Sequence, residues 1–479
     1  MRVEKKFITV NGVLQRNPAW RDPNAAHSAT PASTVASPAQ ALTIVTSPDD
    51  AIDASALLKQ PVPASTAATI EIIQDEAIIS QLNVNDGSVL LDGLSKIFAQ
   101  HEVPVGLLNK LLMLNDYALN FKIDDSGSMQ NTTDSTVKDA SSRHMMEKFA
   151  KAQRRSDSSM TRWEEAEDRL HVFIEMLAYV PSGPITFTFL NRQDTLVLDR
   201  TNKKTPEQFL ADAHEKISAL FVIQPSGNTP MLRNLKNMFA QSSKKTMHYV
   251  LTDGVPSDGT AKDVAKLVLE RTNPQDNPLT FLSCTNEDSQ AEWMKNIEEI
   301  APFTAELDDF GDERKEVLKD QGSTFPYSKG FWLLGNLVAA INPDDLDALD
   351  ESAPFTMGTM ENLMGRALSQ QEYDAYFGQH PAINTRVQVQ DPLLATYKTH
   401  FAQNYPQFCR KDIVSGQIPC VQAYREEMRR QTIKNSPFAQ MLPSAPSGYT
   451  ASPQAMFGGG YSQPAAQPGA TAAGTNYRV

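Results

Sequence analysis

The segment ALNFKIDDSGS, residues 118–128, changes from a largely apolar run to closely spaced oxygen-bearing side chains. Its first six residues, Ala118–Ile123, are predicted to form a β-strand. In a doubly wound α/β sheet, ligands bind beyond the carboxyl ends of the strands. The polar residues that directly follow Ile123 are therefore expected to lie at a ligand-binding edge.

The following sequence alternates predicted strands and helices. We predict strands at 184–191, 194–199, 246–252, 278–284 and 304–308, and helices at 162–180, 205–220, 230–242, 262–272 and 289–301. This alternation is typical of an α/β fold with a doubly wound, mostly parallel sheet and helices on both faces. The first two of these strands are joined too tightly to be parallel, so one is predicted to run antiparallel at an edge.

The regions on either side of this alternation differ in composition. We predict an N-terminal hairpin or arm at 1–22, a disordered Ala/Ser/Thr/Pro-rich linker at 23–68, a helical lead-in at 70–111, a C-terminal helical extension at 311–435 and a disordered low-complexity tail at 436–479. The hairpin is suggested by Asn11-Gly12, a pair that favours a tight turn. The linker and tail contain too few apolar residues to offset the entropy of an ordered chain.

Charge and hydropathy restrict the class of partner and the location. The 479 residues include 44 basic and 57 acidic ones, and the net charge of −13 disfavours nucleic acid as a ligand. No secretory signal peptide is recognisable. The longest apolar run, Phe331–Ile341, is far shorter than the ~20 residues of a transmembrane helix. Cys284, Cys409 and Cys420 form no C-x-x-C pair and are read as free thiols. We expect a soluble, cytoplasmic or otherwise intracellular protein.

Three segments carry the residues of a candidate metal site. Asp124, Ser126 and Ser128 alternate along the loop after the first strand, and Gly127 permits a sharp bend. The loop PSGNTP, residues 225–230, adds Thr229, and the strand-ending sequence YVLTDG, residues 249–254, adds Asp253. Such hard oxygen donors suit Mg²⁺ or Mn²⁺. Asp125 is expected to play a supporting or surface role, because alternation along the loop turns its side chain away.

Together, D-x-S-x-S, G-x-T-P and T-D-G resemble, in this order, the von Willebrand factor A (VWA) family and its metal-ion-dependent adhesion site. The resemblance covers residues 112–310. It implies that Ser126, Ser128 and Thr229 contact the metal, that Asp124 and Asp253 act directly or through water, and that one coordination position accepts an acidic group of a partner. It further implies a non-enzymatic protein–protein interaction module, working as a subunit or scaffold of an intracellular assembly.

The chain departs from the family pattern after the metal loop. There a polar stretch, residues 129–160, separates the loop from the first long helix. Two interpretations stay open: a specificity loop or lid at the mouth of the site, or a disordered surface loop.

Two other functions remain as alternatives. One is a Mg²⁺-dependent phosphatase of the haloacid dehalogenase type, with Asp124 as nucleophile and with Asp253 and Asp258 holding the metal. That chemistry needs a carboxylate two residues after the nucleophile, where this chain has Ser126. Asp258, five residues after Asp253, is read instead as a helix N-cap or turn residue. The other alternative is a VWA fold kept as a structural scaffold without functional metal binding.

Overall fold

The structure is a computed structural model that divides the chain into two units, Met1–Pro61 and Val62–Val479. It describes residues 87–381, except 181, 200–203, 242–244, 286, 342–345, 347–348, 350–353 and 356, together with 7–10, 13–16, 433–434 and 436–442. The predicted linker at 23–68, residues 70–86 of the lead-in, residues 382–432 and 435 of the extension, and residues 443–479 of the tail lie outside the described residues.

In the first unit, two short strands pair on either side of Asn11-Gly12. They are β1 (Phe7–Val10) and β2 (Val13–Arg16). Their pairing is antiparallel, with Val10 opposite Val13. This is the strand arrangement expected of a hairpin at this dipeptide.

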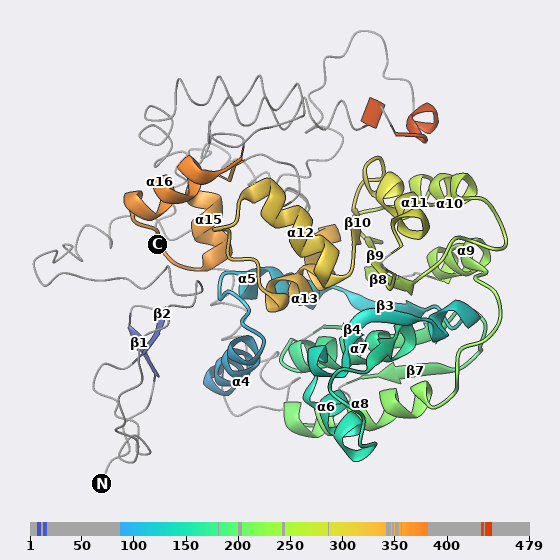
Figure 1. The fold of residues 1–479 in the computed structure, drawn as a ribbon, viewed down its shortest axis with the longest axis horizontal. Coiled ribbons are helices and arrows are strands. Elements are labelled where there is room, and N and C mark those ends of the chain that lie inside the picture. Colours follow the sequence, from blue (N-terminus) through green and yellow to red (C-terminus); the bar gives the residue numbers. More distant parts are fainter. Residues whose placement is uncertain are drawn as a thin grey trace, which may run out of the picture. The chain divides into compact units, whose positions relative to one another are not determined.

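The second unit is built on a six-stranded sheet in the order β10-β9-β8-β3-β6-β7 (Figure 1). Its strands are β3 (Ala118–Ile123), β6 (Ile185–Phe189), β7 (Thr195–Leu198), β8 (Thr246–Thr252), β9 (Leu279–Ser283) and β10 (Thr304–Leu307). All neighbours are parallel except β6 and β7. The α/β class and the antiparallel edge strand predicted from the sequence are confirmed. The strand order reverses between β3 and β8, which is the switch point where ligands bind in such sheets.

Helices cover both faces of the sheet, as predicted. One layer contains α7 (Arg162–Leu177), α8 (Pro206–Phe221) and α13 (Lys329–Val338), and the other contains α9 (Met231–Gln241), α10 (Ala261–Leu269) and α11 (Asp288–Glu298). Figure 1 shows the sheet between α7 and α8 on one side and α9 to α11 on the other. Alternation along β3 explains the layering, because Leu119, Phe121 and Ile123 all point into the layer of α7.

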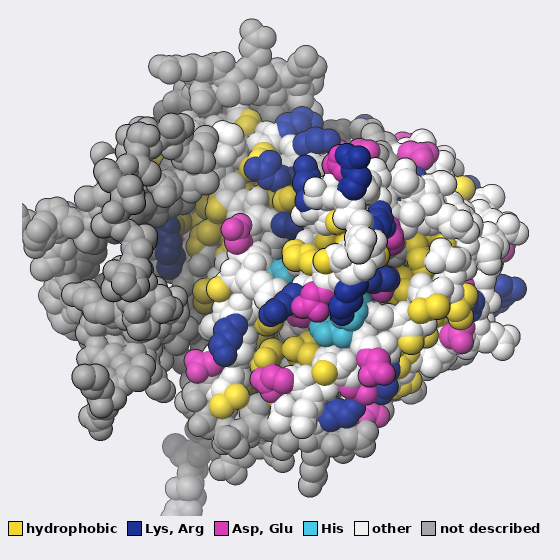
Figure 2. Space-filling view, turned by 60° about the horizontal axis from the view of Figure 1, so that its bottom comes forward, with side chains coloured by type: hydrophobic (Ala, Val, Ile, Leu, Met, Phe, Trp, Pro, Cys, Tyr) yellow, Lys and Arg dark blue, Asp and Glu magenta, His cyan; other side chains and the backbone are white. Residues whose placement is uncertain are grey.

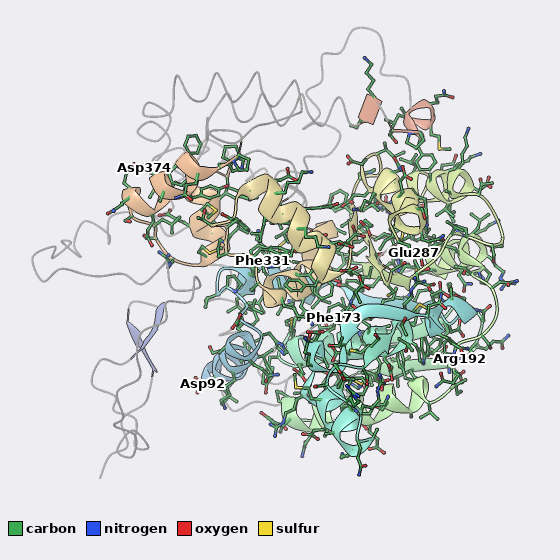
Figure 3. The ribbon with its side chains drawn as sticks, viewed as in Figure 1. Asp92, Phe173, Arg192, Glu287, Phe331 and Asp374 are labelled. Carbon is green, nitrogen blue, oxygen red and sulfur yellow. The ribbon has the colours of Figure 1, made fainter. Side chains whose placement is uncertain are left out.

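Stacked aromatic rings fill the centre of the α7 layer. The ring of Phe121 lies 4.4 Å from that of Tyr249, 5.2 Å from that of Phe187 and 6.0 Å from that of Phe173, measured between centroids. Figure 3 labels Phe173 near the middle of this layer. These contacts hold together β3, β6 and β8, two of which, β3 and β8, lead into the candidate site.

The described parts of the helical lead-in and of the extension belong to the same core as the sheet. The elements concerned are α4 (Gly87–Gln100), α5 (Leu107–Leu112), η3 (Met113–Asp116), α12 (Phe310–Gln321), η6 (Ala339–Ile341), α15 (Met357–Met364) and α16 (Gln370–Gln379). Tyr249 in β8 donates a 2.7 Å hydrogen bond to the Leu337 carbonyl in α13. The Arg169 guanidinium lies 4.6 Å from the Trp332 ring centroid. The boundaries at residues 112 and 310, given by the family resemblance, therefore fall within one continuous apolar cluster.

The 129–160 segment is folded and packs on α7, so the disordered-loop interpretation is wrong. η4 (Gly127–Gln130) leads into the segment, which continues through β4 (Thr132–Thr136), η5 (Val137–Asp139) and α6 (Arg143–Lys151) to β5 (Ser159–Thr161). β4 and β5 are antiparallel. Met145, Phe149 and Met160 form a small core of their own. The Asp168 carboxylate in α7 accepts hydrogen bonds of 2.8 Å from the Ser141 and Ser142 amides.

Histidines also join this segment to its neighbours. The His144 ring in α6 lies 4.3 Å from that of His171 in α7 and 5.2 Å from that of His214 in α8, between centroids. Figure 2 shows histidine side chains on one face of the molecule, with acidic and basic side chains around them.

The first residues of the predicted disordered tail are packed instead. Residues 436–442 include η8 (Ala439–Met441), and Phe438 joins the apolar cluster of α9 to α11, with Met441 and Leu442 against it. This segment packs because three large apolar residues lie within five positions and bury apolar surface. The average composition of residues 436–479 is mainly small and polar and does not show this local cluster.

Candidate metal centre

The pairing of β3 with β8 brings Asp124 and Asp253 to one edge of the sheet. The strands are parallel, with Ile123 opposite Leu251, and the Asp124 amide donates a 2.8 Å hydrogen bond to the Leu251 carbonyl. Each aspartate therefore follows its strand at the carboxyl-terminal edge, where the strand order reverses.

Asp124 is fully buried and held by two hydrogen bonds. Its Oδ1 accepts from the Ser126 amide at 2.8 Å, and its Oδ2 accepts from Thr252 Oγ1 at 2.6 Å. Burial raises the pKa of Asp124 to about 6, and the charge of Asp253 acts in the same direction, while the two hydrogen bonds oppose the rise. A carboxylate destabilised in this way gains from any positive charge placed beside it.

Two serines connect the two aspartates: the Ser126 amide donates to Asp124, and the hydroxyls of Ser126 and Ser128 continue the link to Asp253. Ser126 Oγ lies 3.0 Å from Ser128 Oγ, and Ser128 donates a 2.9 Å hydrogen bond to Asp253 Oδ1. Ligands at right angles around Mg²⁺, each 2.0 to 2.1 Å from the ion, lie ~2.9 Å apart. The spacing of these oxygens fits neighbouring positions around a small, hard cation.

Thr229 is placed by a loop that packs on the metal loop. The Gly127 amide donates to the Gly227 carbonyl at 3.1 Å, and the Ser226 amide donates to the Asp125 carbonyl at 2.7 Å. Thr229 is buried, and its Oγ1 lies 3.7 Å from the position that a Cβ on Gly254 would take. The structure thus places the predicted threonine beside the turn that follows Asp253.

Asp125 is buried, but its side chain contacts the turn after β6 and not the candidate donors. Its carboxylate accepts from the amides of Asn191, at 2.8 Å, and Arg192, at 3.1 Å, in the turn after β6. This arrangement agrees with the supporting role expected of Asp125, although the side chain lies in the interior and not on the surface.

Arg162 is part of this centre and was missed by the sequence reasoning. Its Nη1 lies 2.7 Å from Asp253 Oδ2 and its Nη2 lies 2.9 Å from Glu287 Oε1. Arg162 is the first residue of α7, after a capping box formed by Thr161 and Glu164. No local signal identifies it, because Arg162 and Asp253 are 91 positions apart. Thr252, in contrast, directly precedes Asp253 and could have been found.

Asp258 caps a helix. Its two carboxylate oxygens accept hydrogen bonds of 2.9 Å from the amides of Leu232 and Arg233, in the first turn of α9. The sequence predicted a helix N-cap or turn residue, but the N-cap of the following helix α10 is Thr260, and Asp258 caps α9 from 25 and 26 positions away.

Comparison with known proteins leaves the family open: no protein-family model matches the chain, and no curated protein matches its sequence.

Within the described ranges, no three His, Cys, Asp or Glu side chains are grouped to hold a metal ion. The candidate centre has only two such residues, because its other donors are hydroxyls. Cys284 is a buried free thiol, whereas Cys409 and Cys420 lie outside the described residues. No helix in the described part is long and apolar enough to cross a membrane.

Proposed function

We propose that the chain is a VWA-type interaction module that binds Mg²⁺ or Mn²⁺ at this centre and, through it, an acidic side chain of a protein partner. The observation that carries the proposal is the chain of hydrogen bonds from Asp124 through Ser126 and Ser128 to Asp253, at the point where the strand order reverses. Thr229, on the adjacent loop, completes the set of five oxygen donors.

In the proposed site, the neutral and the charged residues have different roles. Ser126, Ser128 and Thr229 contribute neutral oxygens, while Asp124 and Asp253 contribute negative charge and orient the hydroxyls. A divalent cation, when bound with so few carboxylates, keeps enough positive charge to accept a partner's carboxylate. This charge has to act locally, because the net charge of −13 repels acidic partners at long range.

The phosphatase alternative is less well supported. It needs Asp258 as a metal ligand, but both Asp258 oxygens accept amide hydrogen bonds from α9. It also needs an acid–base carboxylate at position 126, where Ser126 pairs with Ser128. An Asp258→Asn variant that lost Mn²⁺ binding would favour the phosphatase.

The test of the proposal is titration of the full chain with Mn²⁺ by calorimetry. We expect one site, with the affinity lowered at least ~10-fold in Ser126→Ala and in Thr229→Ala. Ser226→Ala is the matched control, because Ser226 lies in the same loop but is exposed. Unchanged Mn²⁺ affinity in both ligand variants would overturn the proposal.

A further inference from the structure

A buried guanidinium lies inside the candidate centre. The side chain of Arg162 is 5% exposed and that of Asp253 is 0% exposed, and they approach to 2.7 Å. The second oxygen of Asp253 accepts the hydrogen bond from Ser128. Asp253 is therefore shared between a hydroxyl that belongs to the donor set and a permanent cation, since arginine does not lose its proton in proteins.

Arg162 changes the charge balance of the site. The formal charges of Asp124 and Asp253 together equal that of a divalent cation, so the ion and its two carboxylates carry no net charge as a set. With Arg162 beside Asp253, one positive charge is left over. Glu287, the other partner of Arg162, offsets this charge only in part, because its side chain is 56% exposed and water screens it.

We propose that Arg162 tunes the centre for anion binding: it weakens the hold on the divalent cation and strengthens the binding of a carboxylate presented to that cation. This inference rests on the proposed function and assigns to Arg162 the role of a specificity-determining residue. Its physical basis is that a charge in a poorly solvated site repels the metal and attracts the carboxylate through the same Coulomb interaction.

A purely structural role makes a different prediction. If Arg162 only held Asp253 in position, its loss would disturb the donor set and weaken the binding of both metal and carboxylate. Charge tuning requires the two affinities to move in opposite directions. The sign of the two changes therefore separates these roles.

The experiment compares the full chain with Arg162→Met, a side chain of similar length without charge. Mn²⁺ affinity is measured from the electron paramagnetic resonance signal of free Mn²⁺. Acetate is then titrated into the Mn²⁺-loaded protein, and its binding is followed by water-proton relaxation. We expect Mn²⁺ to bind at least ~10-fold more tightly and acetate to bind several-fold more weakly in the variant.

Glu287→Gln provides the opposite perturbation at an exposed position, and it remains informative if Arg162→Met fails to fold. It leaves the guanidinium in place and removes the negative charge beside it. We expect weaker Mn²⁺ binding and stronger acetate binding. If both affinities fall together in Arg162→Met, or if neither moves in Glu287→Gln, the inference is wrong while metal binding stands. If the unaltered chain binds no Mn²⁺, the inference fails together with the proposed function.

Discussion

Thr252 Oγ1 donates a 2.6 Å hydrogen bond to Asp124 Oδ2, so that the last residue of β8 holds the carboxylate that follows β3. Both residues are fully buried. The contact ties the end of β8 to the loop that follows β3, and so joins the two segments that carry Asp253 and Asp124.

Replacing Thr252 with Val should destabilise the protein by ~1–3 kcal/mol, because it leaves a buried carboxylate oxygen without its donor. The measurement is urea unfolding in EDTA at pH 8, where Asp124, with a pKa of about 6, is ionised. Thr280→Val is the matched control, since Thr280 is equally buried and its hydroxyl has no hydrogen-bond partner. Equal losses in the two variants would contradict the role of the Thr252 contact.

Gly227→Ala should destabilise the chain by ~1–3 kcal/mol and lower its Mn²⁺ affinity. Gly227 has a φ of +105°, and an added Cβ would lie 3.1 Å from Asn191 Cγ. The resulting strain falls on the loop that carries Thr229. Gly335→Ala, in α13, should instead be neutral or stabilising, because its Cβ would make only a 3.5 Å contact with Leu307. Urea unfolding and Mn²⁺ titration of both variants test this difference in stability and in Mn²⁺ affinity. Equal stability and equal affinity in the two variants would contradict the prediction.

His248 should make the protein less stable in acid. Burial lowers the pKa of His248 from 6.5 to about 4. The unfolded chain takes up a proton as the pH falls below 6.5 and the folded chain does not, so the free energy of unfolding drops between pH 6.5 and about 4. The loss attributable to this residue is at most ~3 kcal/mol. Urea unfolding from pH 8 to pH 4 should show a shallower decline in His248→Leu, and parallel profiles would contradict the assignment.

Removing the segment around Phe438 should expose part of the α9 to α11 layer. We expect a chain ending at Lys434 to be ~2 kcal/mol less stable than one ending at Leu442, because Phe438 is buried in that layer. Phe438→Ala in the full chain should reproduce most of the loss. Identical thermal midpoints for the two truncated chains would show that the segment contributes nothing.

The sequence by itself determined the elements and loops that local pattern specifies. The predicted strands at 118–123 and 246–252 coincide with β3 and β8. The motifs on these two strands place Asp124, Ser126, Ser128 and Asp253 together, because parallel neighbours end at the same edge. Membership of the VWA family and the bound metal remain predictions, carried by the spacing of these residues.

Only the tertiary structure decided which distant residues share an environment. Arg162 meets Asp253 across 91 positions of sequence, and the Tyr249 hydroxyl meets the Leu337 carbonyl across 88. Phe438 likewise reaches an apolar cluster that begins at Leu190. Periodicity reports which face of an element is apolar, but not which other element covers that face. Local spacing therefore predicted the five oxygen donors, whereas packing between distant segments places the positive charge of Arg162 beside Asp253.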